Sequence, residues 1–183
     1  MNPLKSITGT IVLGIVLAVI LSLIIEWPQK DFVLAIERWV HFLSGITWIG
    51  LLYYFNFVQV PAMASAAADK DGPGPAAIGK YVAPLALLWF RWAALVTWLS
   101  GAAYLHSADH LSLVEAFTLQ GPSQLIGVGA WLGTIMLFNV WVLIWPNQKK
   151  VLGLVSATDA EKDTAKFVAL MASRTNTLLS IPM

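Results

Sequence analysis

Long apolar stretches alternate with short polar segments along this chain. They cover residues 7–25, 39–60, 82–105 and 123–145. Each is close to the roughly 20 residues that an α-helix needs to cross about 30 Å of hydrocarbon. The polar, Gly- and Pro-rich segment Asp69–Pro75 separates the second stretch from the third. The pattern predicts an all-α integral membrane bundle of four transmembrane helices, in which residues 1–183 form a single membrane domain.

Prolines are expected to mark the ends of these helices. Pro61 and Pro146 follow the second and fourth stretches, and Pro84 and Pro122 lie at the first turns of the third and fourth. The first stretch is longer than the apolar core of a signal peptide and lacks an A-x-A-like cleavage site. We therefore expect it to be retained as a helix.

The composition agrees with a membrane protein. Apolar residues make up 58% of the chain and charged residues 11%, whereas about 25% of a typical soluble domain is charged. Nine tryptophans fit a chain that crosses two membrane–water interfaces. Cysteine is absent, which excludes disulfides, Cys-ligated zinc, iron–sulfur clusters and covalently attached c-type haem. The net charge of +1 gives no reason to expect nucleic acid as a partner.

The distribution of Lys and Arg predicts the orientation. With four spans, the N-terminus, the second loop and the C-terminal tail share one side. That side carries eight basic residues: Lys5, Lys70, Lys80, Lys149, Lys150, Lys162, Lys166 and Arg174. The other side carries only Lys30 and Arg38. The positive-inside rule places both termini in the cytoplasm, and we expect the chain to lie in a bacterial inner membrane.

The segment after Pro146 leaves two alternatives open. Residues Thr158–Glu161 form a capping-box pattern, which predicts a helix through Lys162–Ala172. The apolar run Leu178–Met183 follows it. Residues 146–183 are then either a cytoplasmic tail that lies on the membrane or on a neighbour, or a tail whose last residues begin a fifth membrane helix.

The three histidines are predicted at the periplasmic face. His41 lies near the start of the second stretch, while His106 and His110 follow the third. Gly45 and Trp48 share a helix face with His41, so Gly45 leaves room for a flat ligand and Trp48 walls it. One hypothesis is that His41 ligates the iron of haem b, with His106 or His110 as second ligand. The alternative is an interfacial histidine bonded to a backbone carbonyl.

A second polar group is predicted in the cytoplasmic half. Arg91 is the only charge within the four stretches, and Asn56 and Asn139 lie in the same half of the membrane. Ionisable residues inside a membrane commonly mark functional sites, so this group is a candidate site for an anionic or amide-rich ligand such as a purine, a quinone or a propionate. The alternative is that these side chains hydrogen-bond between helices. Arg91 lies about 18 Å deeper than His41 along the bundle, so the two groups are expected to be separate sites.

Four blocks of the sequence are similar to a known family. They are HFLSGITWIGLLYYFNFVQVPA, APLALLWFRWAALVTWLSG, LGTIMLFNVWVLIWPNQKKVLG and ASRTNTLLSIPM. In this order they resemble the membrane domain of PuuD-type urate hydroxylases, the urate oxidase N-terminal family, over about residues 37–183. His41 with Trp48-Ile49-Gly50 is more distantly similar to HemJ- and CopD-type membrane proteins. The HemJ likeness implies that His41 ligates haem.

The chain departs from that family at one point. Full-length PuuD-type proteins end in a periplasmic cytochrome c domain, whose covalent haem needs cysteines that this chain lacks. The resemblance therefore implies either a separate periplasmic cytochrome c as partner or loss of the urate hydroxylase reaction.

Three functions follow as hypotheses. In the first, the chain is a haem-b membrane protein that passes electrons from urate or a quinol to the periplasmic cytochrome, with Arg91, Asn56 and Asn139 orienting the donor. In the second, it is a non-catalytic accessory subunit of a respiratory or photosynthetic complex, packed on a membrane-protein partner or on a second copy. In the third, it is a transporter that uses Arg91, which is disfavoured because none of the four spans is predicted to be broken.

Overall fold

The computed structural model describes residues 2–26 and 32–183, and in these ranges all regular structure is helical. Four helices within them are long and apolar enough to cross a membrane: Ile7–Ile24, Phe32–Ala68, Ile78–Ser107 and Gly121–Val151. The predicted all-α membrane architecture is confirmed. Lys30, which entered the orientation argument, lies outside the described residues.

The chain divides into two compact units, residues 1–36 and 37–183. In the first unit, a short 3₁₀ turn, Pro3–Lys5, leads into α1, Ile7–Glu26. Helix α1 is apolar on all sides, as expected of a helix that crosses a membrane. The single membrane domain that the sequence suggests stays a prediction.

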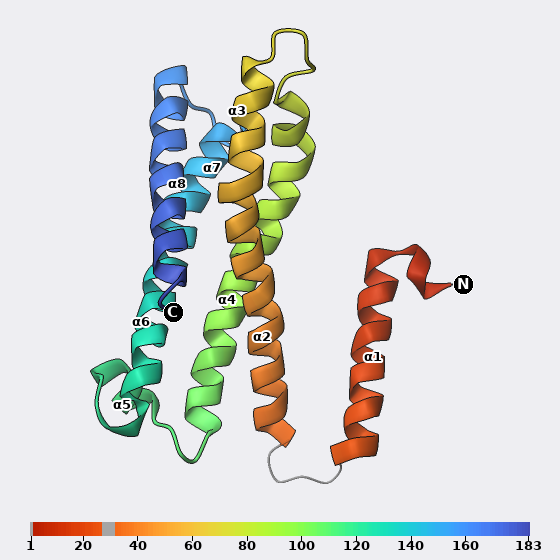
Figure 1. The fold of residues 1–183 in the computed structure, drawn as a ribbon, viewed down its shortest axis with the longest axis vertical. Coiled ribbons are helices and arrows are strands. Elements are labelled where there is room, and N and C mark those ends of the chain that lie inside the picture. Colours follow the sequence, from red (N-terminus) through yellow and green to blue (C-terminus); the bar gives the residue numbers. More distant parts are fainter. Residues whose placement is uncertain (1, 27–31) are drawn as a thin grey trace. The chain divides into compact units, whose positions relative to one another are not determined.

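Residues 32–183 include three long helical rods (Figure 1), and all but the first turn of the first rod lies in the second unit. The first rod joins α2 (Phe32–Tyr53), the π-helical stretch η2 (Tyr54–Gln59) and α3 (Val60–Ala68). The second joins the π-helical stretch η3 (Ile78–Val82) and α4 (Ala83–Ser107). After the short α5 (Leu113–Thr118), the third joins η4 (Gly121–Ser123), α6 (Gln124–Phe138), the π-helical stretch η5 (Asn139–Ile144) and α7 (Trp145–Val151).

The expectation that Pro61 and Pro146 follow helix ends is wrong, because the helices continue through both. Pro61 is the second residue of α3 and Pro146 the second residue of α7. Proline cannot donate a backbone hydrogen bond and its ring crowds the preceding turn. Each π-helical stretch ends two residues before a proline, at Gln59, Val82 and Ile144. The wider turn accommodates the proline, so the first rod reaches 37 residues and the third 31.

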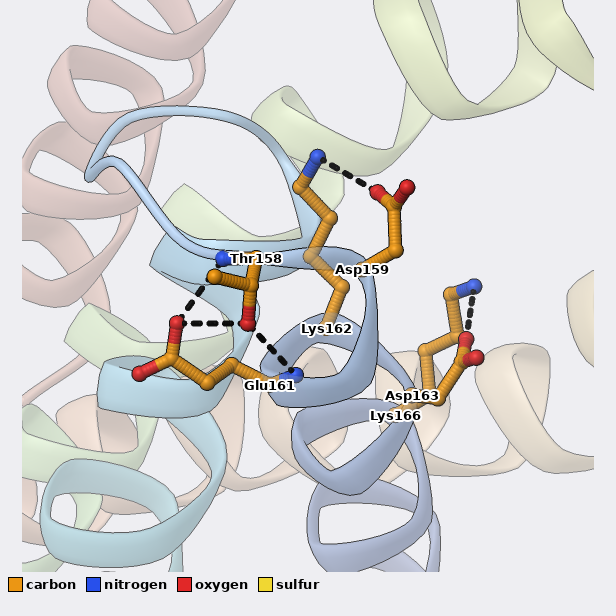
Figure 2. Close-up of polar contacts among 6 residues, drawn as sticks. All are labelled: Thr158, Asp159, Glu161, Lys162, Asp163 and Lys166. Atoms are coloured by element: carbon orange, nitrogen blue, oxygen red, sulfur yellow. Dashed lines mark hydrogen bonds and ion pairs between the residues drawn. The ribbon is translucent and has the colours of Figure 1, made fainter.

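The C-terminal segment forms a helix that packs back on the third rod. Helix α8, Asp159–Ser180, is longer at both ends than the predicted helix and begins with the predicted capping box (Figure 2). It packs against α7, η5 and α6 through a buried face of small residues, Ala165, Ala169 and Ala172, followed by Asn176. Figure 1 shows α8 running antiparallel to the third rod. Helix α8 is not among the four described helices that are long and apolar enough to cross a membrane, and both alternatives for this segment stay predictions.

The core of the second unit lies where the three rods and α8 meet. Its fully buried side chains include Trp48 and Leu52 from the first rod, Phe90 from the second, and Met136 and Val140 from the third. Phe55 packs edge-on against Phe90, with ring centroids 5.5 Å apart. This packing holds α2, α4 and α6 together around the His41 region.

Candidate functional site

A cavity of about 410 Å³ lies next to His41, between α2, α4 and α6. Its size is within the range of small-molecule and cofactor sites. Aromatic side chains and small residues make up most of its lining. The lining residues include Arg38, His41, Phe42, Trp48, Trp98, Gly101, Ala102, Tyr104, Phe117, Gly129, Ala130 and Gly133. Small residues on both α4 and α6 leave the space open, and Arg38 supplies its only full positive charge.

The imidazole of His41 is held by the backbone of α4. Its Nδ1 lies 2.8 Å from the carbonyl oxygen of Thr97 and 3.5 Å from the hydroxyl oxygen of Ser100. Because a carbonyl only accepts hydrogen bonds, this contact assigns the proton to Nδ1 and leaves a free electron pair on Nε2. A metal-binding histidine typically donates its other ring N–H in this way. The backbone hydrogen bond of the non-ligand alternative is therefore present, and it also prepares Nε2 to bind a metal.

Gly101 provides the space that the imidazole occupies. A Cβ atom built on Gly101 would lie 2.9 Å from Cε1 and 3.1 Å from Nδ1 of His41. The residue predicted to leave room, Gly45, does not line the cavity, and a Cβ there would meet only Cγ2 of Thr97, at 3.7 Å. Sequence reasoning missed Gly101, although the run of small residues from Ser100 to Ala103 is a signal that could have found it.

Trp48 carries a polar group that the described residues leave without a partner. Its side chain is 1% exposed and lines the cavity, and its buried Nε1 has no hydrogen-bond partner among residues 2–26 and 32–183. A buried donor left unpaired costs about 1–3 kcal/mol. Trp48 and His41 thus line the same cavity, and the role of Trp48 beside a cofactor stays a prediction.

The two other histidines lie apart from the cavity. His106, in the last turn of α4, and His110, in the following connection, are both exposed, and neither lines the cavity. A role for either as second iron ligand stays a prediction.

Asn56 and Asn139 are used in contacts with α8. Nδ2 of Asn56 donates to the Leu52 carbonyl at 2.9 Å and to the Ser173 hydroxyl at 2.8 Å. Nδ2 of Asn139 donates to Oδ1 of Asn176 at 2.8 Å. Asn176 itself is fully buried and donates to the Met136 carbonyl at 3.0 Å. These bonds match the alternative in which the amides join helices, and substrate binding by them stays a prediction.

Arg91 has a different environment from the two asparagines. Its guanidinium carbon lies 3.8 Å from the centroid of the Trp145 ring. Within the described ranges, no hydrogen bond or ion pair joins Arg91 to Asn56, Asn139 or a carboxylate. The predicted group of three is therefore divided, because Asn56 and Asn139 each bond to α8 whereas Arg91 lies against Trp145 of α7.

The fold and cavity define a multi-pass membrane protein with a ligand-sized site inside its helical bundle. Residues 109–183 match the family model described as urate oxidase N-terminal. This confirms the resemblance to the PuuD-type family over the part of the chain that contains α5 to α8. A search of the curated proteins and of the solved structures gives no match. The similarity to HemJ- and CopD-type proteins stays a prediction.

Proposed function

We propose that this chain is a urate hydroxylase-related membrane redox protein that binds haem b through His41. The observation that carries the proposal is the hydrogen bond between Nδ1 of His41 and the Thr97 carbonyl, beside a cavity of about 410 Å³. That bond leaves Nε2 free to ligate iron and fixes the plane of the imidazole.

The residues around the cavity fit such a cofactor. Imidazole is a common axial ligand of haem iron. Phe42 and Trp48 offer apolar walls, and Arg38 supplies a cation for a propionate carboxylate. Ala102 on α4 and Gly129 and Gly133 on α6 leave room for a flat ring between the two helices. Haem b, when bound, supplies one-electron chemistry. The chain's own residues orient the ligating nitrogen, exclude water and compensate the negative charge.

The direction of electron flow follows from the predicted topology. The His41 cavity lies in the half of the bundle nearest α5, which the positive-inside rule assigns to the periplasm. The acceptor we propose is a periplasmic cytochrome c. The proposed electron donor is urate or a quinol, and its binding site is separate from the cavity.

A spectrum of the purified full-length chain tests the proposal. We expect a reduced-minus-oxidised difference spectrum with the α-band of b-type haem in the wild type and in the control Leu43→Ala, whose exposed side chain on α2 does not line the cavity. His41→Ala should lose the band. A band that persists in His41→Ala refutes the ligand assignment. A wild-type protein without haem from haem-replete cells refutes the redox function and favours the accessory-subunit hypothesis, which predicts co-purifying partners instead.

A further inference from the structure

Two cations contact one tryptophan at the end of the bundle away from His41. The guanidinium of Arg91, on α4, lies 3.8 Å from the Trp145 ring centroid, and Nζ of Lys149, one turn further along α7, lies 5.9 Å from the same centroid. All three side chains are partly exposed. We call Arg91, Trp145 and Lys149 the cationic cluster.

The cationic cluster lacks a negative partner in the part of the chain that the structure describes. The ion pairs found there join Lys162 to Asp159 and Lys166 to Asp163 (Figure 2), on the exposed start of α8. Two positive charges beside one indole, without a carboxylate, form a site for an anion.

An apolar groove continues from the cationic cluster along the same two rods. Leu95 and Leu99 lie one and two turns after Arg91 on α4, and Trp141 lies about one turn before Trp145. Together with Trp98 and Phe138 they line an open groove of about 390 Å³. Leu99 and Phe138 are more than half exposed, so the groove faces the surroundings of the bundle, which are lipid in a membrane. Trp92, next to Arg91, packs edge-on against Trp141 with centroids 5.4 Å apart and joins the two parts.

We propose that the cationic cluster and this groove form one site for an anionic phospholipid. The phosphate diester contacts Arg91 and Lys149, and an acyl chain lies in the groove towards Leu99. The cluster lies near the basic residues that the positive-inside rule assigns to the cytoplasm, where anionic lipids are attracted to juxtamembrane cations. A free phosphate would use the cations but not the groove, and a neutral lipid would use the groove but not the cations. This site is independent of the haem proposal.

Native mass spectrometry of the full chain in detergent tests the site. The probes are phosphatidylglycerol and phosphatidylcholine with the same acyl chains, and glycerol phosphate as a headgroup without chains. We expect the wild type to retain phosphatidylglycerol in preference to phosphatidylcholine, and Arg91→Gln to weaken that preference about fivefold, the effect of one basic residue near anionic lipid. Arg174→Gln, which removes an equal charge from an exposed position on α8, should leave it unchanged.

The groove has its own pair of variants. Leu99→Trp fills the groove and should lower retention of phosphatidylglycerol, whereas Leu85→Trp, at an exposed position of the same helix outside the groove, should not. This pair also tests the site without changing any charge in the bundle. Equal retention by Arg91→Gln and the wild type overturns the proposal. Displacement of phosphatidylglycerol by glycerol phosphate also overturns it, and would identify a site for soluble anions.

Discussion

A methyl group added at Gly101 would meet the imidazole of His41 directly. The new Cβ would lie 2.9 Å from Cε1 and 3.1 Å from Nδ1, well inside ordinary contact distance between such atoms. The imidazole must move, because the backbone of α4 that carries Gly101 is fixed by its helical hydrogen bonds. The movement breaks the bond to the Thr97 carbonyl, worth about 0.5–1.5 kcal/mol, and turns Nε2 away from the cavity.

The expected consequence is a loss of haem with little loss of fold. Outer-sphere changes around metal-ligating histidines typically cost 10–100-fold in metal affinity, so we expect Gly101→Ala to bind haem about 10–100-fold more weakly. Haem titration of the apoprotein gives the affinity, and thermal unfolding of the haem-free protein checks the fold. Gly45→Ala is the matched control, because its Cβ would lie 3.7 Å from Cγ2 of Thr97. Wild-type haem affinity in a folded Gly101→Ala protein would refute the argument that α4 orients His41.

Three further predictions concern α8. Asn176→Leu removes the acceptor of Asn139 and leaves that buried amide unpaired, so the free energy of unfolding should fall by about 1–3 kcal/mol. Denaturation in detergent measures this change. A fall no larger than that caused by Asn147→Leu would contradict the role of the buried pair. Thr158→Ala removes the N-cap of α8 and should destabilise its first turn by about 0.5–2 kcal/mol, seen as faster amide exchange near Glu161 with unchanged exchange near Asn176. The Thr158 backbone N–H and, next, its hydroxyl lower the pKa of Glu161. The ionised carboxylate of Glu161 therefore stabilises the start of α8 above its unfolded pKa, and this stabilisation is lost as the pH falls through the lower folded pKa. Amide exchange at the start of α8, corrected for its intrinsic pH dependence, should become faster at low pH in the wild type and not in Glu161→Gln. Equal pH profiles of the two proteins would contradict this role of the Glu161 carboxylate.

The sequence was sufficient for features that depend on composition or on contacts a few residues apart. Membrane spans are set by the length and apolarity of a stretch, and the four long helices agree with the predicted stretches. The capping box of α8 is likewise a local pattern, in which Thr158 and Glu161 exchange hydrogen bonds. Both could be predicted from neighbouring residues alone.

Features that depend on which helix faces which could not be predicted in this way. Gly101 matters because its missing side chain lies against His41, 60 positions away in the chain. Asn139 and Arg91 look alike in a single sequence, since both are polar groups inside apolar stretches. Only the packing of α8 gives the first an amide partner, and only the position of α7 gives the second an indole.

The π-helical stretches have a consequence for insertions and deletions. A π-helical turn holds about one residue more than an α-helical turn. Deleting a single residue within Tyr54–Gln59 would convert the stretch to an ordinary α-helix. Because the wide turn absorbs the extra residue, the deletion would leave α2 and α3 facing the same neighbours and His41 in place. Each π-helical stretch is therefore a point where the chain can lose one residue of length without changing which side chains face the bundle.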